Sequence, residues 1–218
     1  MFTGIIEAVG RVATSQMRQG DLRLRIETCG LDLSDVAVGD SIAVNGVCLT
    51  AVELPGDGFW ADVSAETLSR SLFGDYEPGT RVNLEKSLLP TTRLGGHMVS
   101  GHVDGVGEVL DRREEARSVR FHIRVPDALA RFMAEKGCVS IDGTSLTING
   151  VEGAVFDVNI VPHTLKHTVI GGYRPATRVH LEVDVIARYL ERLLLGADAA
   201  RTTAKLTLND LCRAGFAR

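Results

Sequence analysis

An internal repeat sets the strongest limit on how this chain can fold. The segment TGIIEAVGRV, which starts at Thr3, aligns with SGHVDGVGEV, which starts at Ser100, at an offset of 97 residues. The same offset relates NGVCLT at 45 to DGTSLT at 142, ETL at 66 to HTL at 163, and TRVNLE at 80 to TRVHLE at 177. Because the matches keep one register without insertions, we interpret the chain as two gapless copies, residues 1–97 and 98–194, followed by a tail.

Each copy is expected to consist mainly of short β-strands. Apolar or alternating segments such as LRLRIET (22–28), SIAVNGVCLTAVE (41–53) and RVNLE (81–85) are separated by glycine and asparagine turns. The second copy has VRFHIRV (119–125) in the place of LRLRIET. Several short strands and no long helical segment favour a small closed barrel, since closure removes exposed strand edges.

One short helix per copy is also expected. In PDALARFMAEKG, Pro126 suits a first helical position and Gly137 suits a C-terminal cap. The predicted fold is therefore mostly β, with two tandem, homologous, six-stranded, Greek-key-like barrels. We assign the first barrel to residues 1–97 and the second to residues 98–185.

The last part of the chain, residues 186–218, is predicted to begin with an amphipathic helix. The sequence VIARYLERLLLG places four apolar side chains on one face and charged side chains on the other. The first copy has no counterpart, so this apolar face either packs on the barrels or joins other chains, and we favour association. The last segment, TLNDLCRAGFAR, could add a short helical turn or fray.

Charge and composition restrict the classes of partner. The net charge of −4 provides no positive excess to neutralise a phosphate backbone or an anionic membrane surface. The N-terminus has no basic leader with an apolar stretch, so a cytoplasmic location is expected. No C-x-x-C pair is present, and the cysteines are expected to be reduced. His163 and His167 are four residues apart, which would suit a helix face, but we expect two polar residues near a turn and no metal.

Positions where the copies differ in reactive chemistry are the best candidates for function. The pairs that differ are Ile5 and His102, Cys48 and Ser145, Ser41 and Cys138, and Ser87 and Asp184, whereas Thr50 and Thr147, and Thr67 and Thr164, agree. His102 could be a strand histidine without a task, but the glycine-rich setting GGHMVSGHVDGVG lets backbone approach a ligand closely. Histidine also moves protons near neutral pH, so we favour a functional role for His102. His97 lies five residues before His102 and would face the opposite side of a continuous strand. For His97, a functional role and a purely structural one are equally favoured.

Cys48 and Thr50 are predicted to lie on one face of a strand, as are Ser145 and Thr147. Cys48 could be a small apolar filler or a reactive thiol. Two matching polar pairs in two related barrels suggest twin pockets for a polar small molecule. Asp184 could be solvated or anchor that ligand. The chain has no phosphate-binding loop and no strand followed by G-x-G-x-x-G and a helix, so the residues alone name no substrate.

Longer motifs add a family resemblance. MFTGII at the start, SIAVNGVCLT at 41, GGHMVSGHVDGVG at 95, DGTSLTING at 142 and VPHTL at 161 resemble the alpha-type riboflavin synthases. This resemblance implies homotrimers of two-barrel subunits joined by a C-terminal helix, with no cofactor or metal. It also implies dismutation of two 6,7-dimethyl-8-ribityllumazine molecules, by four-carbon transfer, to riboflavin and 5-amino-6-(D-ribitylamino)uracil. Lumazine synthase is a further candidate partner.

The same resemblance implies site residues. Phe2, Thr3 and Gly4 match the family's N-terminal segment, which would lie by the site and contact the substrate. The first pocket would use Ser41, Cys48, Thr50, Asp62 and Ser64. The second would use Lys136, Ser145, Thr147, Val161, Thr164 and Asp184, with His97 and His102 near the junction. The residues expected to act in catalysis are His102, Cys48, Ser41, Ser145, Thr147 and Asp184. A non-catalytic lumazine or flavin carrier of the same fold is the alternative function, and a purely structural barrel module is a third.

Overall fold

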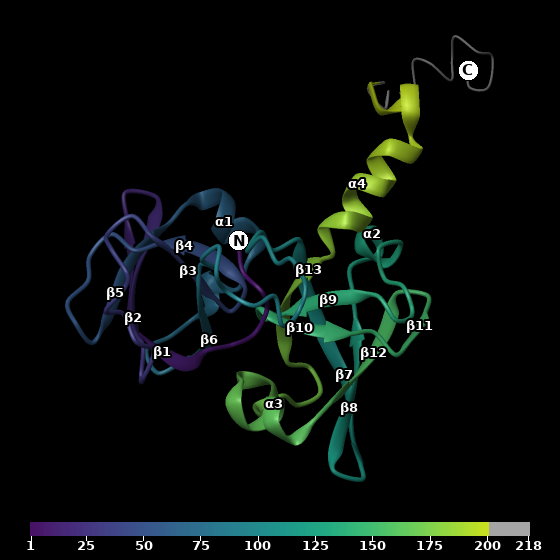
Figure 1. The fold of residues 1–218 in the computed structure, drawn as a ribbon, viewed down its shortest axis with the longest axis horizontal. Helices are drawn as coiled ribbons and strands as arrows, with labels where there is room; N and C mark the ends of the chain where they lie inside the picture. The colour runs from purple at the N-terminus through teal and green to yellow at the C-terminus, as the bar shows by residue number, and fades with distance from the viewer. Residues whose placement is uncertain (201–218) are drawn as a thin grey trace, which may run out of the picture. The chain divides into compact units, whose positions relative to one another are not determined.

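The computed structural model describes residues 1–200, and two antiparallel sheets dominate it (Figure 1). The first sheet has six strands in the order β4-β3-β6-β1-β2-β5. These strands are β1 (Ala8–Arg18), β2 (Asp21–Glu27), β3 (Ser41–Val44), β4 (Val47–Thr50), β5 (Gly58–Val63) and β6 (Arg81–Lys86).

The second sheet has seven strands in the order β10-β9-β13-β7-β8-β12-β11. They are β7 (Gly105–Glu115), β8 (Ser118–Arg124), β9 (Cys138–Ile141), β10 (Thr144–Thr147), β11 (Gly150–Glu152), β12 (Val155–Ile160) and β13 (Arg178–Val183). In both sheets a late strand lies between two early ones, β6 between β3 and β1 and β13 between β9 and β7, which is a Greek-key-type connection.

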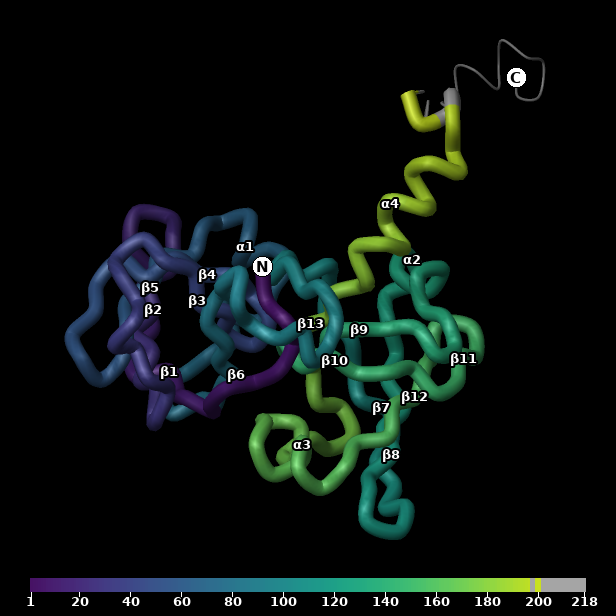
Figure 2. The backbone as a smooth tube through the Cα atoms, viewed as in Figure 1, coloured from purple at the N-terminus to yellow at the C-terminus, as the bar shows by residue number. Residues whose placement is uncertain are grey.

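The structure confirms the 97-residue repeat at every strand of the first sheet. Strand β1 begins and ends 97 residues before β7, and the same offset relates β2 to β8, β3 to β9, β4 to β10, β5 to β12 and β6 to β13. Even the irregularity between Val12 and Thr14 recurs between Val109 and Asp111. The two copies, followed from purple to green in Figure 2, therefore have the same local structure.

The seventh strand is a difference from the expected six. In the first copy, Glu53 and Trp60 form an isolated bridge that links the end of the β4 segment to β5. In the second copy, the equivalent residues Gly150 and Asp157 belong to a longer pairing of β11 with β12. The same closing contact is therefore present in both copies, and its length decides whether it counts as a strand.

A tight two-residue turn joins β3 to β4, and an equivalent turn joins β9 to β10. Asn45 and Gly46, between β3 and β4, have φ of 45° and 79°. Asp142 and Gly143, between β9 and β10, have φ of 43° and 82°. Two consecutive positive φ values are typical of the two-residue hairpin turn that matches strand twist, and Asn-Gly and Asp-Gly are its favoured sequences.

Each sheet encloses its own apolar core. Alternate residues of β2, such as Leu24 and Ile26, are fully buried with Phe59 of β5 in the first core. Phe121 and Ile123 of β8 and Phe156 of β12 occupy the corresponding places in the second core. Burying such a side chain contributes about 1.5–3 kcal/mol, so the inner face of each strand fixes its register.

Short helices connect the strands. They are α1 (Ala65–Arg70), α2 (Asp127–Ala130) and α3 (Pro162–His167), with 3-10 turns η1 (Phe73–Asp75) and η2 (Val169–Gly172). The prediction for α2 was wrong in extent, because the helix ends at Ala130 and Gly137 lies beyond it. Pro126 precedes the first helical residue instead of occupying it. His163 and His167 lie on α3 with their rings stacked 4.2 Å apart, so the expected turn is a helix.

The predicted C-terminal helix is α4 (Val185–Leu194), followed by η3 (Gly196–Ala200). Residues 1–187 form one compact unit, and the described residues from 188 onwards belong to another. Helix α4 is strongly amphipathic and has no buried residue. The segment TLNDLCRAGFAR lies outside the described residues. No helix in residues 1–200 is long and apolar enough to cross a bilayer.

Candidate functional site

The outer surface of the first barrel carries a row of polar side chains. In β4, Val47 and Leu49 belong to the core, whereas Cys48 is half-buried and Thr50 is exposed. This alternation confirms that Cys48 and Thr50 share one face of the strand. Ser41 of β3 pairs directly with Thr50, and its carbonyl accepts the Ser87 N–H at 3.1 Å. Thr50, Ser41 and Ser87 thus follow one another around the outside of the barrel.

The second barrel repeats this arrangement with different chemistry. Thr147 of β10 pairs with Cys138 of β9, and Ser145 pairs with Ser140. Ser145 is half-buried and Thr147 exposed, so these two also share a face, as predicted. Asp184, which follows β13, accepts the Ile186 N–H at 2.9 Å through one carboxylate oxygen. Burial, and then the nearby Asp184 carboxylate, raise the pKa of the Cys138 thiol.

Two segments, residues 2–4 and 99–101, cross between the barrels and reach these polar rows; we call them the crossing segments. Phe2 and Val99 form an antiparallel bridge with each other. The Gly4 carbonyl accepts the N–H of Ser145 at 2.8 Å, and the Gly101 carbonyl accepts the N–H of Cys48 at 2.8 Å. The segment that leads into each barrel therefore pairs with the strand that carries the polar row of the other barrel.

Glycine is required at both contacts. A Cβ on Gly4 would lie 2.5 Å from Cβ of Ser145, and one on Gly101 would lie 2.7 Å from Cβ of Cys48. Both glycines also have positive φ, 75° and 81° respectively. The backbone can approach Ser145 and Cys48 this closely only because no side chain intervenes.

Each crossing segment is held by a carboxylate of its own barrel. Glu85 accepts the Thr3 N–H at 2.6 Å, the Thr3 hydroxyl at 2.7 Å and the Gly4 N–H at 3.0 Å. Glu182 accepts the equivalent three groups of Ser100 and Gly101 at 2.6, 2.6 and 2.9 Å. Burial raises the pKa of Glu85, and these hydrogen bonds oppose the shift. Sequence reasoning missed this role, although the glutamate recurs in TRVNLE and TRVHLE at the common offset.

A cavity of about 180 Å³ lies beside Cys48. Its lining includes Thr67, Arg70 and Ser71 from α1 and the residue after it, and Gly101 and His102 from the crossing segment. His102 is exposed and belongs to no strand. The structure therefore brings His102 to the polar row of the first barrel, next to Cys48, although its sequence position lies in the second copy.

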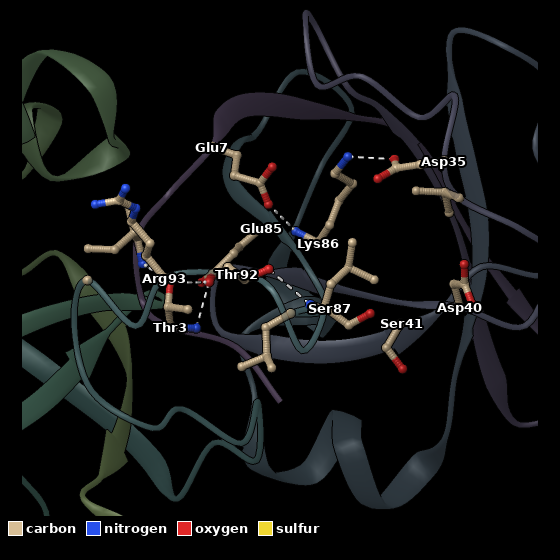
Figure 3. Close-up of a pocket in the computed structure, with 15 residues that line it drawn as sticks. Thr3, Glu7, Asp35, Asp40, Ser41, Glu85, Lys86, Ser87, Thr92 and Arg93 are labelled. Atoms are coloured by element: carbon tan, nitrogen blue, oxygen red, sulfur yellow. Dashed lines mark hydrogen bonds and ion pairs between the residues drawn. The ribbon is translucent and has the colours of Figure 1, made fainter.

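A larger cavity, of about 590 Å³, lies beside Ser41 (Figure 3). Thr3, Ile5, Glu85 and Ser87 also line it, so it adjoins the crossing segment. Within this cavity the Lys86 ammonium group binds Asp35 at 2.6 Å and the Lys86 N–H donates to Glu7 at 2.7 Å. Asp40 and Arg93 lie on opposite sides of the view. Ser41 and Cys48 thus face separate cavities of one barrel.

His97 is paired with Ser145 of the second barrel. Its Nδ1 lies 2.7 Å from the Ser145 hydroxyl oxygen, and its backbone N–H donates to the Thr3 carbonyl at 3.2 Å. Burial lowers the pKa of the His97 imidazole, which favours the neutral ring. The other ring nitrogen, Nε2, is buried and has no hydrogen-bond partner among the described residues. A neutral imidazole beside a hydroxyl can orient it and accept its proton.

The remaining candidate residues lie around these centres. Asp62 is exposed on β5 and lies 3.6 Å from the Arg23 guanidinium, and the Ser64 hydroxyl caps α1 by accepting the Thr67 N–H at 3.3 Å. Lys136 is exposed with φ of 64°, ahead of β9. Val161 is exposed and precedes α3, which carries half-buried Thr164. Among residues 1–200, neither Asp62 nor Lys136 forms a hydrogen bond to the crossing segments.

The described residues contain no group of three or more histidine, cysteine or acidic side chains arranged to hold a metal ion. Half-buried serines and cysteines and exposed threonines instead supply most of the polar groups of each row, and these side chains are uncharged. Such surfaces suit an uncharged heterocycle with many hydrogen-bonding groups.

Comparison with known proteins identifies the fold. The family model of the lumazine binding domain matches the chain twice, over residues 3–87 and 100–184. Among solved structures, LumP complexed with riboflavin superposes with a TM-score of 0.77 and 26% identity, covering 84% of this chain and 99% of that one. LumP complexed with 6,7-dimethyl-8-(1'-D-ribityl) lumazine gives a TM-score of 0.76 at 24% identity, which shows the fold.

Curated relatives match the whole chain. The riboflavin synthase of Photobacterium phosphoreum is 49% identical over 216 residues, which cover 99% of both chains. That of Photobacterium leiognathi is 48% identical over 217 residues, again 99% of both chains. Since these relatives align from end to end and both copies match the lumazine binding domain, the chain belongs to the riboflavin synthase family.

Proposed function

We propose that this enzyme dismutates two molecules of 6,7-dimethyl-8-ribityllumazine, by transfer of a four-carbon unit, to riboflavin and 5-amino-6-(D-ribitylamino)uracil. The observation that carries the proposal is the end-to-end similarity to riboflavin synthases, at 49% identity over 216 residues. The tandem repeat supports it, because a reaction between two copies of one compound requires two similar pockets.

The polar rows are the proposed substrate sites. Residues 1–97 would form one lumazine-binding domain and residues 98–185 the other. The outer-face pairs Cys48 and Thr50, and Ser145 and Thr147, would each contact one lumazine. Holding two substrates face to face can contribute about 7–11 kcal/mol to a reaction when the reacting atoms are well oriented. No cofactor enters this scheme.

The proposed chemistry begins with loss of a proton from the 7-methyl group of one lumazine. The conjugated ring delocalises the resulting negative charge. A hydroxyl, thiol or water adds to C7 of the second lumazine, and the first then attacks the second to form a joined adduct. Eliminations release the two products and return the added group and the protons, so no external oxidant or reductant is needed.

The roles of individual residues follow their contacts. His102 would move protons, because it is exposed beside the Cys48 cavity. Cys48 or Ser41 would assist addition to C7 or hold the added group. Ser145, held by neutral His97 at 2.7 Å, would orient the other lumazine with Thr147. Asp184, at the end of the second polar row, would anchor a polar group of that ligand.

Assembly belongs to the proposal as well. We assign oligomerisation to residues 186–218, because α4 has an apolar stripe and no buried residue. A homotrimer would place the first barrel of one subunit opposite the second barrel of its neighbour. A cytoplasmic location and an association with lumazine synthase complete the predicted setting.

The direct test is to mix the purified protein with the lumazine and follow the absorbance and fluorescence of riboflavin. We expect one riboflavin formed for every two lumazines consumed. A carrier protein would bind the lumazine and change its fluorescence without forming riboflavin, and a structural module would do neither. Either of these two results would overturn the proposal.

A further inference from the structure

Two side chains cross between the barrels at equivalent positions, Asn83 in β6 and His180 in β13. The Nδ1 of His180 lies 2.8 Å from the Asn45 carbonyl oxygen, and its Nε2 accepts the Leu72 N–H at 2.7 Å. Nε2 can accept only through its lone pair, so the ring is neutral, with its proton on Nδ1. Both bonds run from the second barrel to the first.

Asn83 makes the same two bonds in the opposite direction. Its side-chain amide nitrogen donates to the Asp142 carbonyl at 2.8 Å, and its Oδ1 accepts the Val169 N–H at 2.8 Å. Asp142 and Val169 are the residues 97 positions after Asn45 and Leu72. The amide of Asn83 and the imidazole of His180 therefore perform one task, with one donor and one acceptor each.

The backbone groups that they hold follow the short helices α1 and α3. Leu72 lies two residues after α1, and α1 together with Ser71 lines the cavity next to Cys48. Val169 occupies the equivalent place after α3. Helix α1 has six residues, none of them buried. A helix this short has little stability of its own, so its position depends on the contacts at its ends.

We propose that each barrel anchors the short helix of the other, α1 or α3, and that His180 makes the anchor of α1 release in acid while Asn83 keeps the anchor of α3 insensitive to pH. Only the consequence for ligand binding rests on the proposed function. His180 is thus a positioning residue: it acts on the first pocket through the Leu72 backbone.

Protonation explains why the two anchors differ. An imidazolium ring has two donors and no acceptor, so Nε2–H would meet the Leu72 N–H. A buried N–H without an acceptor costs about 1–3 kcal/mol. The Asn83 amide has no proton to gain in this pH range and keeps its acceptor.

The groups around His180 set when it protonates. Burial lowers the pKa of His180, and the Asp142 carboxylate, 3.6 Å from Nδ1, opposes this shift. Asp142 in turn accepts the Tyr173 hydroxyl at 2.5 Å and the His180 backbone N–H at 2.8 Å, while burial raises its own pKa. Tyr76, whose ring lies 6.1 Å away, has its hydroxyl bound by Asn45.

The outer neighbours add less. Arg178 lowers the pKa of His180 slightly and is paired with Asp75 at 2.8 Å. With a pKa below its usual 6.5, His180 binds its proton more readily in the unfolded chain than in the folded one. Its contribution to stability is therefore complete well above pH 6.5 and declines as the pH falls through and below that value.

Hydrogen exchange of single backbone amides tests the anchor without any ligand. We expect the protection factor of the Leu72 amide to fall on the order of tenfold between pH 7 and pH 5, because the buried N–H loses its acceptor when His180 gains a proton. The Val169 amide, measured in the same sample, should keep its protection. Equal behaviour of the two amides would overturn the proposal.

Three substitutions identify the titrating group. His180→Asn copies the anchor of the other barrel and should make the Leu72 amide insensitive to pH. Asn83→His should do the reverse and make the Val169 amide sensitive, which tests the idea even if His180→Asn folds poorly. Asp142→Asn, which copies Asn45, should leave the acid release at Leu72 in place. Loss of the release in Asp142→Asn but not in His180→Asn would assign the proton to Asp142 and overturn the role of His180.

Riboflavin fluorescence titration then tests the link to the first pocket. We expect the affinity of the intact protein for riboflavin to fall several-fold from pH 7 to pH 5, and His180→Asn to abolish that fall. If riboflavin binds no variant at any pH, the proposed function fails, while the Leu72 exchange result stands. If binding keeps its full pH dependence in His180→Asn, the coupling of the anchor to the pocket is wrong.

Discussion

The reactive side chains of the two copies sit in unlike surroundings, even though their backbones match. Ser145 has the imidazole of His97 2.7 Å from its hydroxyl, whereas Cys48 packs against Phe2 and Val99. His102 stands at the cavity beside Cys48. Each barrel therefore receives one histidine, but only the histidine of the second barrel is buried and hydrogen-bonded to the polar row.

Replacing His102 tests its proposed role in proton transfer. We expect His102→Ala to lower kcat by about 10²–10⁴-fold, because a positioned acid–base group acts mainly in the transition state. Binding of riboflavin, followed by fluorescence titration, should change only a few-fold. His122→Ala, on strand β8 and outside the lining of the cavity beside Cys48, serves as the control and should keep full turnover. Normal turnover in His102→Ala would remove the residue from the mechanism.

At the scale of elements, the crossing segments depend on glycine at their tightest contacts. Gly101 has φ of 81°, and a Cβ there would meet Cys48 at 2.7 Å and Phe2 at 2.8 Å. Gly20, in the turn between β1 and β2, also has positive φ, 97°, but nothing lies within 4 Å of its added Cβ. Comparing Gly20 with Gly101 therefore separates the cost of a positive φ from the cost of a steric clash.

We expect Gly20→Ala to lower the free energy of unfolding by about 1–2 kcal/mol through the left-handed conformation alone. Gly101→Ala should cost about 1–3 kcal/mol more, because the new methyl group has no room between Cys48 and Phe2. Urea unfolding of both variants, monitored by circular dichroism, measures the difference. Equal losses would mean that the crossing segment moves away from β4 without cost.

Within residues 186–218, to which we assign assembly, helix α4 is the element that we expect to make the contacts between subunits. A chain that ends before Ile186 should form smaller assemblies and make no riboflavin, because the proposed paired site needs two subunits. A chain that ends after Ala200 keeps α4 and is the matched control, expected to assemble and turn over normally. Analytical ultracentrifugation and the riboflavin assay follow both. An intact and active assembly without α4 would refute this assignment.

At the scale of the whole molecule, the two barrels meet through contacts that occur in equivalent pairs. The hydrogen bond between His180 and Leu72 corresponds to that between Asn83 and Val169. The bond between Gly4 and Ser145 likewise corresponds to that between Gly101 and Cys48. Gly46 and Gly143 also approach each other, since a Cβ on Gly46 would lie 2.6 Å from the Gly143 nitrogen. Each barrel thus presents equivalent backbone donors and acceptors to the other barrel.

This equivalence predicts the behaviour of residues 1–97 expressed alone. The fragment has its own core and should fold, and a second copy of it offers the Leu72 N–H and the Asn45 carbonyl that Asn83 would meet in a dimer. We expect it to self-associate and to bind riboflavin or the lumazine through Ser41, Cys48 and Thr50. It should make no riboflavin at a useful rate, because His102, Ser145, Thr147 and Asp184 lie in the second copy.

Fluorescence titration and a long incubation with the lumazine test both halves of this prediction. Absence of binding would count against an independent first pocket. Rapid synthesis would overturn the catalytic assignments in the second copy.

The sequence by itself determined the local structure of this protein. One offset of 97 residues predicted two copies, and alternation together with Asn45–Gly46 defined the hairpin that puts Cys48 and Thr50 on one outer face. These features depend on neighbours in the chain, where side-chain period and turn chemistry leave few alternatives. The extent of the helix after Pro126 was wrong, because end signals fix helix boundaries poorly.

Only the tertiary structure decided which residues meet across the barrels. No periodicity indicates that Gly4 pairs with β10, that His97 reaches Ser145, or that His102 stands beside Cys48. The sequence also did not predict the contacts of Glu85, Glu182, Asn83 and His180, although the repeat showed that these residues occupy equivalent positions. Such contacts join residues far apart in the chain, so they depend on how the two cores are placed against each other, and local sequence patterns carry no information about that placement.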